Sequence, residues 1–143
     1  MHDAFYKPTV KIIIGDSTHT LNKDEIFGYR DNENMIFRFY EKHIYKLLNP
    51  NEKILLYSRT LLGGYKNSAT ITKYYFSAGA NAGILPLTKW DIKNAFSNDS
   101  AFRELLDMYF HTDSDLLKYD SFAKMYKLNR VFQFAGQMVF KNK

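Results

Sequence analysis

The chain of 143 residues contains no cysteine. This absence excludes disulfide bonds, thiolate metal ligands and a cysteine nucleophile. It does not identify the compartment, because an oxidising space permits disulfides without requiring them. Long apolar runs are missing as well. The longest, such as residues 12–14, are far too short to span a bilayer, and no basic segment with a long apolar stretch follows Met1. We therefore expect neither a transmembrane segment nor a visible signal peptide.

Acidic residues are absent from the C-terminal end of the chain. Residues 1–120 carry 15 Lys and Arg against 15 Asp and Glu, whereas no acid follows Asp120. The formal net charge of +5 therefore falls entirely on Lys124, Lys127, Arg130, Lys141 and Lys143. This pattern argues against a generally basic protein and confines any anion-binding site to one short segment.

The length predicts one domain over residues 1–143, and the apolar fraction of 45% and charged fraction of 24% are typical of globular proteins. Aromatic residues are the exception, since 12 Phe, 11 Tyr and one Trp make up 17% of the chain. Such residues favour pleated surfaces and bury large areas. The simpler interpretation is an aromatic-rich core, and the alternative is that some tyrosine faces are binding platforms.

The first half of the chain reads as strands. Short β-branched, aromatic or apolar segments alternate with turn residues, and the expected strands are residues 9–14, 18–21, 26–30, 35–40, 44–48, 53–60 and 71–77. Their near-regular spacing predicts an antiparallel meander or a partly closed barrel within residues 5–78.

The second half has helical periodicity. Thr88 is a suitable N-cap for a helix over residues 89–96, and residues 97–100 end that helix and cap the next, over about residues 101–110, with Ser100 as the cap. In the second helix the apolar residues repeat at spacings of three and four: Phe102, Leu105, Leu106 and Tyr109.

A last helix is expected to begin at Asp113 or Ser114. Its apolar face would hold Phe122, Met125, Tyr126, Asn129 and Phe132, and its opposite arc would hold Lys124, Lys127 and Arg130. Beyond about Val131 the pattern fits either a helix or a hairpin. The sequence thus predicts an α+β fold in which helices within residues 88–135 pack against the sheet.

No motif in the sequence assigns a reaction. There is no phosphate-binding loop, dinucleotide-binding turn, nucleophile elbow or zinc-protease pair. Residues 31–34 resemble the start of a calcium loop, but its sixth and twelfth places hold Ile36 and Lys42. A turn over residues 31–34 is therefore the expected structure. His111, Asp113 and Asp115 alternate as metal ligands do, yet helix capping explains both acids better. We expect no metal, no cofactor and no catalytic residue, and the sequence favours a non-enzymatic protein.

The first functional hypothesis is a binding module for an unidentified ligand or protein partner. The strand aromatics would form its contact surface, on the face of the sheet that the helices leave open, and at least some of them should be partly exposed. The candidate residues are Tyr29, Phe37, Tyr40, Tyr57 and Tyr75.

The second hypothesis is a single-stranded nucleic-acid-binding module. It combines the strand aromatics, which lie beside Arg30 and Arg38, with a basic patch of Lys124, Lys127 and Arg130. The helix dipole also explains cations near a helix C-terminus. Because the chain before Thr88 holds 11 basic against eight acidic residues, less positive than a usual nucleic-acid groove, this hypothesis ranks second.

Seven segments spread over most of the chain carry a resemblance to known proteins. They are residues 21–30, 37–40, 54–57, 74–77, 85–88, 119–120 and 125–130. Together they resemble small uncharacterised bacterial proteins that are exported across the inner membrane and have a β-rich front followed by helices. The resemblance implies a periplasmic or secreted location and no particular activity. A cytoplasmic location is the alternative, because no signal peptide is visible.

Overall fold

The computed structural model describes residues 9–22, 27–62 and 69–138. The chain divides into two compact units: the first holds residues 1–50 and 57–75, and the second holds residues 51–56 and 76–143. The single domain expected from the chain length stays a prediction. Predictions for Ile26, Lys141, Lys143 and the other positions within residues 1–8, 23–26, 63–68 and 139–143 fall outside the described residues.

The first unit begins with a β-hairpin. Strand β1 (Thr9–Ile14) pairs antiparallel with β2 (Ser17–Asn22), as the sequence predicted. Gly15 in the turn has a φ of 60°. That left-handed conformation carries no steric penalty for glycine, which is why the chain can reverse there in so few residues.

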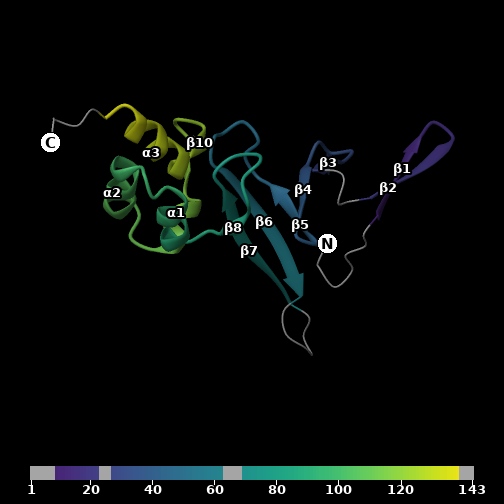
Figure 1. Ribbon diagram of the computed structural model, residues 1–143, viewed down its shortest axis with the longest axis horizontal. Helices are drawn as coiled ribbons and strands as arrows, with labels where there is room; N and C mark the ends of the chain where they lie inside the picture. Colours follow the sequence, from purple (N-terminus) through teal and green to yellow (C-terminus); the bar gives the residue numbers. More distant parts are fainter. Residues whose placement is uncertain (1–8, 23–26, 63–68, 139–143) are drawn as a thin grey trace. The chain divides into compact units, whose positions relative to one another are not determined.

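Six further strands form one antiparallel sheet in sequence order (Figure 1). They are β3 (Gly28–Arg30), β4 (Ile36–Tyr40), β5 (His43–Leu47), β6 (Leu55–Leu62), β7 (Thr70–Ser77) and β8 (Leu85–Pro86). The α+β class and the meander are confirmed. The partly closed barrel is wrong, because the sheet does not close.

Two local features set the start of this sheet. Asp31 Oδ1 accepts hydrogen bonds from the backbone N–H of Glu33 (3.0 Å) and of Met35 (2.9 Å). Such side-chain bonds hold residues 31–34 in the turn expected from the sequence. Across the ladder, Gly28 lies opposite Arg38, and any side chain at position 28 would overlap the carbonyl oxygen of Phe37. Glycine therefore permits the close approach of β3 to β4.

Helices dominate the second unit, and side chains cap the first two of them. Helix α1 (Lys89–Ala95) begins after Thr88, whose hydroxyl accepts a bond from Asp91 N at 3.0 Å, as predicted. Helix α2 (Ser100–Tyr109) and its N-cap each come one residue earlier than the sequence predicted. Asp99, not Ser100, is the N-cap and accepts from Phe102 N at 3.0 Å, since Asp caps as well as Ser does.

The expected helix from Asp113 or Ser114 is wrong. A short 3₁₀ helix, η3 (Asp113–Leu117), and a small antiparallel ladder of β9 (Tyr119–Asp120) and β10 (Met125–Tyr126) come first. Asp120 Oδ1 accepts bonds from the N–H groups of Phe122 (3.0 Å) and Ala123 (2.9 Å). This local bonding competes with helix formation and turns the chain.

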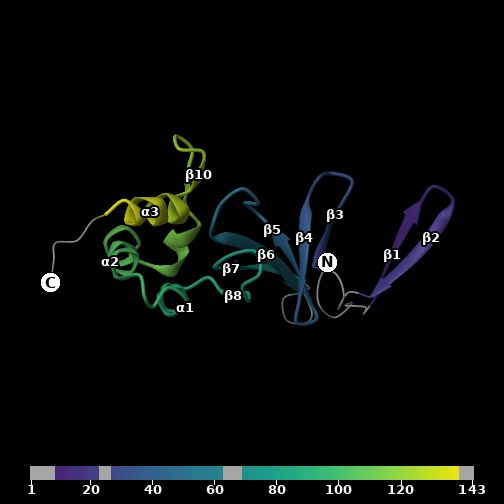
Figure 2. The same ribbon diagram turned by 45° about the horizontal axis from the view of Figure 1, so that its top comes forward.

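Helix α3 (Lys127–Gly136) follows β10, so the ambiguous end of the chain is helical through residue 136. Figure 2 shows α3 beside α2, with β10 next to its start. The rings of Phe96, Phe102 and Phe132 meet with centroids 4.9–5.2 Å apart. Residues with no exposed surface complete the core of this unit: Ile54, Leu56, Phe76, Ile92, Leu106, Phe110, Leu116 and Leu128. Burial of these side chains is the main stabilising term of the unit.

One buried polar side chain ties α3 to residues 52–54. Asn129 is only 2% exposed, and its Oδ1 accepts a bond from Ile54 N at 2.8 Å. Its Nδ2 donates to Ile54 O at 2.8 Å and to Glu52 Oε1 at 2.9 Å. Glu52 Oε1 also accepts from Tyr126 N at 3.2 Å. The amide thus satisfies buried backbone groups immediately before β6, which would otherwise be costly to bury.

Replacing this amide should destabilise the protein strongly. Asn129→Ala leaves the N–H and C=O of Ile54 without this partner, so we expect the free energy of unfolding to fall by about 2–5 kcal/mol. Urea unfolding followed by circular dichroism measures the change. Asn94→Ala, on the exposed side of α1, is the control and should change stability by no more than about 0.5 kcal/mol. Equal effects of the two substitutions would contradict the role of Asn129.

Candidate functional site

The five aromatic candidates of the sheet do not share one surface. Tyr29 lies opposite Phe37 in the ladder, and their rings stack with centroids 5.0 Å apart. Tyr40 is an odd number of residues from Phe37, so it points to the other face of the sheet. Four of the five are half-buried, whereas Tyr57 is 1% exposed. The half-buried candidates are Tyr29, Phe37, Tyr40 and Tyr75. They do not form one exposed surface, because Tyr29 and Phe37 lie on one face of the sheet and Tyr40 lies on the other.

We call the packed side chains around Arg38 and Tyr45 the sheet cluster. It includes three of the candidates: Tyr40, Tyr57 and Tyr75. Arg38 is 4% exposed, and its Nη1 donates to the Tyr57 hydroxyl at 3.0 Å. Its guanidinium carbon lies 5.3 Å from the ring centroid of Tyr40. The Tyr75 ring meets the Tyr45 ring edge to face, with centroids 5.0 Å apart. Burial is the main cause that raises the pKa of Tyr45 to about 12, and the neighbouring Tyr75 is the next cause. Cation–π contacts and burial give these side chains a role in holding the sheet together.

The three residues of the predicted basic patch do not lie on one helix arc. Lys124 has a φ of 58° in the turn between β9 and β10. Lys127 opens α3, and its Nζ donates to the carbonyl oxygen of Tyr109 at 3.4 Å while lying 5.5 Å from the ring centroid of Phe110. Arg130 is exposed on α3. Lys127 and Arg130 line a cleft, and Lys124 is not part of its lining.

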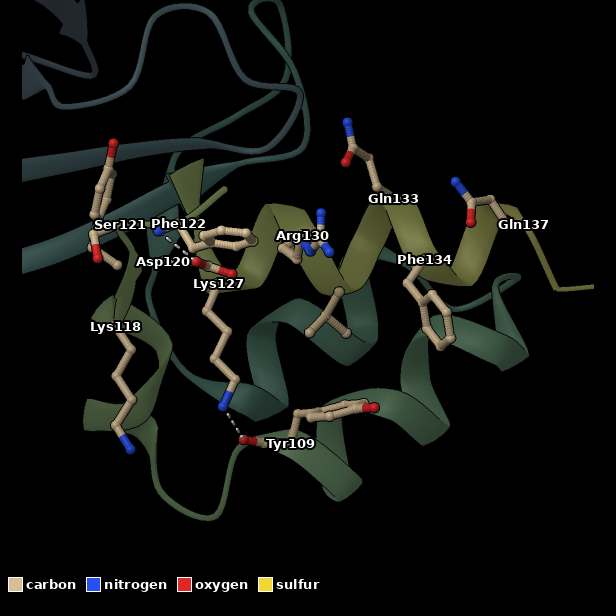
Figure 3. A pocket seen from close by; sticks show the side chains of 12 residues that line it. Tyr109, Lys118, Asp120, Ser121, Phe122, Lys127, Arg130, Gln133, Phe134 and Gln137 are labelled. Carbon is tan, nitrogen blue, oxygen red and sulfur yellow. Dashed lines mark hydrogen bonds between the residues drawn. The ribbon is translucent and has the colours of Figure 1, made fainter. Parts of the chain in front are cut away.

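That cleft has a volume of about 860 Å³ and lies wholly within the second unit, between the end of α2, the β9–β10 turn and α3 (Figure 3). We call it the basic aromatic cleft. Its rings are Tyr109, Tyr119, Phe122 and Phe134, and its cations are Lys118, Lys127 and Arg130. Figure 3 shows Lys127 reaching from α3 to the end of α2, whereas Gln133 and Gln137, which also line the cleft, point away from α2.

The rings of the cleft are unusually accessible. Phe122 is 94% exposed, Tyr119 55%, Phe134 51% and Tyr109 40%. Single exposed apolar side chains are ordinary, but a group of them around one concavity marks an interaction site. The sequence placed Tyr109 and Phe122 on apolar helix faces. An Asp side chain favours a turn because it can bond the backbone N–H two residues ahead. Asp120, two residues before Phe122, was therefore the signal in the sequence that Phe122 lies outside a helix.

Phe122 is presented on a fixed turn. The two hydrogen bonds to Asp120 Oδ1 hold the backbone of Phe122 and Ala123, and the ladder pairs Tyr119 with Tyr126. The rings of Tyr119 and Tyr126 also meet edge to face, with centroids 5.2 Å apart. Because the backbone of this turn is already held, little backbone entropy is lost when a ligand covers the ring.

Positive charge prevails on the lining. Asp120 is the one carboxylate among the described lining residues, and its Oδ1 is engaged in the turn. Lys118 Nζ lies 3.3 Å from Asp115 Oδ1, with 61% of its side chain exposed. The side chain of Arg130 makes no hydrogen bond or ion pair within the described part of the chain. Its guanidinium is therefore available to pair in a bidentate manner with a carboxylate or phosphate.

Asp115 has a capping role, as the sequence indicated. Its Oδ2 accepts bonds from the N–H groups of Thr112 (3.1 Å) and His111 (2.9 Å), which, with Lys118, lower its pKa from 3.8 to about 2. Asp113 Oδ1 accepts from Lys89 N at 2.8 Å. Over residues 9–22, 27–62 and 69–138 no three His, Asp or Glu side chains gather as a metal site would need.

None of the helices in the described residues has the length and apolar character needed to cross a membrane. The chain matches no protein-family model, no curated protein and no solved structure. The geometry of the cleft is therefore the basis for a proposed function.

Removing the hydroxyl of Tyr57 tests the structural role of the sheet cluster. In Tyr57→Phe the buried guanidinium of Arg38 loses a hydrogen bond, so the free energy of unfolding should fall by about 1.5–3 kcal/mol. Tyr40→Phe is the matched control, since its ring stays over Arg38. Chemical denaturation of both variants measures the difference, and a Tyr57 variant as stable as the control would show that the bond contributes nothing.

Acid titration tests the cap at Asp115. Its folded-state pKa is lowered, so its stabilising effect is present above 3.8 and is lost as the pH falls to about 2. Asp115→Asn should therefore lower the melting temperature near neutral pH. The difference in melting temperature between this variant and the unaltered chain, which is the gap measured here, should become smaller as the pH falls from 3.8 to about 2. Glu104→Gln, at an exposed site on α2, serves as the control. A gap that stays constant from neutral pH to pH 2 contradicts the assignment.

Proposed function

We propose that the protein is a non-catalytic binding module and that its basic aromatic cleft holds an anionic ligand bearing a flat ring. One observation carries this proposal: exposed aromatic rings and cations line the same concavity of about 860 Å³. Small-molecule and fragment sites combine an apolar wall with a few polar groups that orient the ligand. The cleft has both parts.

The rings would supply most of the affinity. Fully covering a large apolar side chain stabilises a complex by roughly 1.5–3 kcal/mol, and Phe122 enters the complex almost completely exposed. The cations would orient the charged end of the ligand. Arg130 is the main anchor, because Lys127 is engaged with the carbonyl oxygen of Tyr109 and Lys118 is close to Asp115.

The ionisable groups of the cleft support binding better than catalysis. Acid–base chemistry uses two groups that converge on a reacting atom. In the described lining, Asp120 accepts two backbone hydrogen bonds through one oxygen, which gives it a part in holding the turn. The other charged lining residues are cations, a composition suited to pairing with an anion.

A location outside the cytoplasm, in the periplasm or secreted, is a separate proposal. It is supported by the resemblance of the sequence to exported bacterial proteins. The chemistry of the cleft is the same in either compartment, so the binding proposal does not depend on it.

Anilinonaphthalene sulfonate, which joins flat rings to an anion, is a direct probe of the cleft. In titrations of the isotope-labelled chain followed by NMR, amide shifts should concentrate at Phe122, Arg130 and Phe134. Arg130→Gln should weaken probe binding about tenfold, the loss expected for one charge-assisted hydrogen-bonded pair. Arg103→Gln removes an exposed charge from α2 outside the cleft lining and should change nothing.

Shifts that spread evenly over the chain, or equal losses in the two arginine variants, would contradict the proposal. Both arginines are exposed, so we expect each variant to keep the fold, and circular dichroism of each variant checks this. Binding of the probe only to a variant that has lost its fold, and not to the folded chain, would also contradict the proposal.

A further inference from the structure

We infer that the ligand of the basic aromatic cleft is single-stranded nucleic acid. This inference rests on the proposed binding function and names its ligand class. Bases offer flat faces that stack on aromatic side chains, and the phosphates between them pair with Lys and Arg. Rings and cations on one surface are the two groups that such a polymer engages together.

Rings and cations are interspersed along the lining. Lys118 is followed by Tyr119 and Phe122, and on α3 Lys127 and Arg130 precede Phe134. The α3 residues are spaced by three and four positions, so they share one side of the helix. In Figure 3 Arg130 lies between Phe122 and Phe134. An extended strand passing over Arg130 could place a base on either of these rings and a phosphate on the guanidinium.

The exposed rings of the cleft favour a single strand over a duplex. Stacking on the four exposed rings requires bases that are not already stacked and paired, and in a double helix the base faces are covered. Duplex binding would engage only the cations. The described cleft has three of those, and they give weak, salt-sensitive attraction by themselves.

Acidic peptides and anionic membranes explain the cleft less well. Carboxylates of a peptide would pair with Arg130 and the lysines but would leave the exposed rings without flat partners. A bilayer surface is broad, whereas Tyr109 and Phe134 line a concavity between α2 and α3. Nucleic acid is the class that uses both the rings and the charges.

The structure thus gives the nucleic-acid hypothesis a different surface from the one the sequence suggested. Tyr29, Phe37 and Tyr40 belong to the first unit, whereas Lys127 and Arg130 belong to the second. The cleft supplies its own rings from the second unit. The strand aromatics are not required for this inference.

Fluorescence anisotropy of a labelled oligothymidylate of about 12 nucleotides, with the full chain at about 50 mM salt, is the central experiment. We expect saturable binding. Because each phosphate neutralised on a single strand contributes about −0.7 to the slope of log K against log salt, three cations predict a slope of about −2.

Two pairs of variants separate charge from stacking. Arg130→Gln should weaken binding and reduce the slope to about −1.4, whereas Arg103→Gln should leave both unchanged. Phe122→Ala should weaken binding about tenfold with the slope kept, as expected for one lost stacking partner. Trp90→Ala is its control, since Trp90 is 72% exposed and is not part of the cleft lining.

Polyglutamate and phosphatidylglycerol vesicles are the competing ligands, each tested with the same variants. If either binds with dependence on Arg130 and Phe122 while the oligothymidylate does not, the inference is overturned and the proposed binding function stands. If the oligothymidylate binds but each variant behaves as its control does, the inference is also overturned, because the cleft is not the site. Failure of anilinonaphthalene sulfonate to bind the cleft would instead remove the proposed function itself.

Discussion

The side-chain amide of Asn129 is the interaction on which the second unit depends. It satisfies both backbone groups of Ile54 and one oxygen of Glu52, at distances of 2.8–2.9 Å. Asn129, a buried helix residue, thereby makes the hydrogen bonds to residues 52–54 that a neighbouring strand would otherwise make. Since α3 also carries Arg130 and Phe134, the same amide that fixes the helix fixes one wall of the basic aromatic cleft.

A second local constraint builds the other wall. Asp120 closes the turn between β9 and β10 through two backbone hydrogen bonds, and the result is a Phe122 ring with 94% of its surface exposed. The cost of exposing an aromatic ring is offset by binding only if the ring stays where a ligand can reach it. A capped, paired turn meets that condition, and a continuous helix through Phe122 would not have placed the ring in the same way.

Sequence reasoning succeeded where short-range chemistry decides the structure. β-Branched and aromatic segments gave the meander, and the hydroxyl of Thr88 gave the start of α1. It failed at Asp120, because the periodic spacing of Phe122, Tyr126 and Asn129 also fits a helix, and only the local side-chain bonds select the turn. The cleft escaped prediction for the same reason, since it combines residues from α2, a turn and α3 that no sequence spacing relates. The division of Tyr29 and Tyr40 between sheet faces could be read from the register alone.

Native-state hydrogen exchange of the Ile54 amide tests the central role of Asn129 most directly. We expect this N–H, which donates to a buried side chain, to exchange with the same free energy of opening as the core amides of α3, because both depend on one interaction. An Ile54 amide that exchanges as fast as an exposed loop, while the α3 amides stay protected, would contradict this expectation.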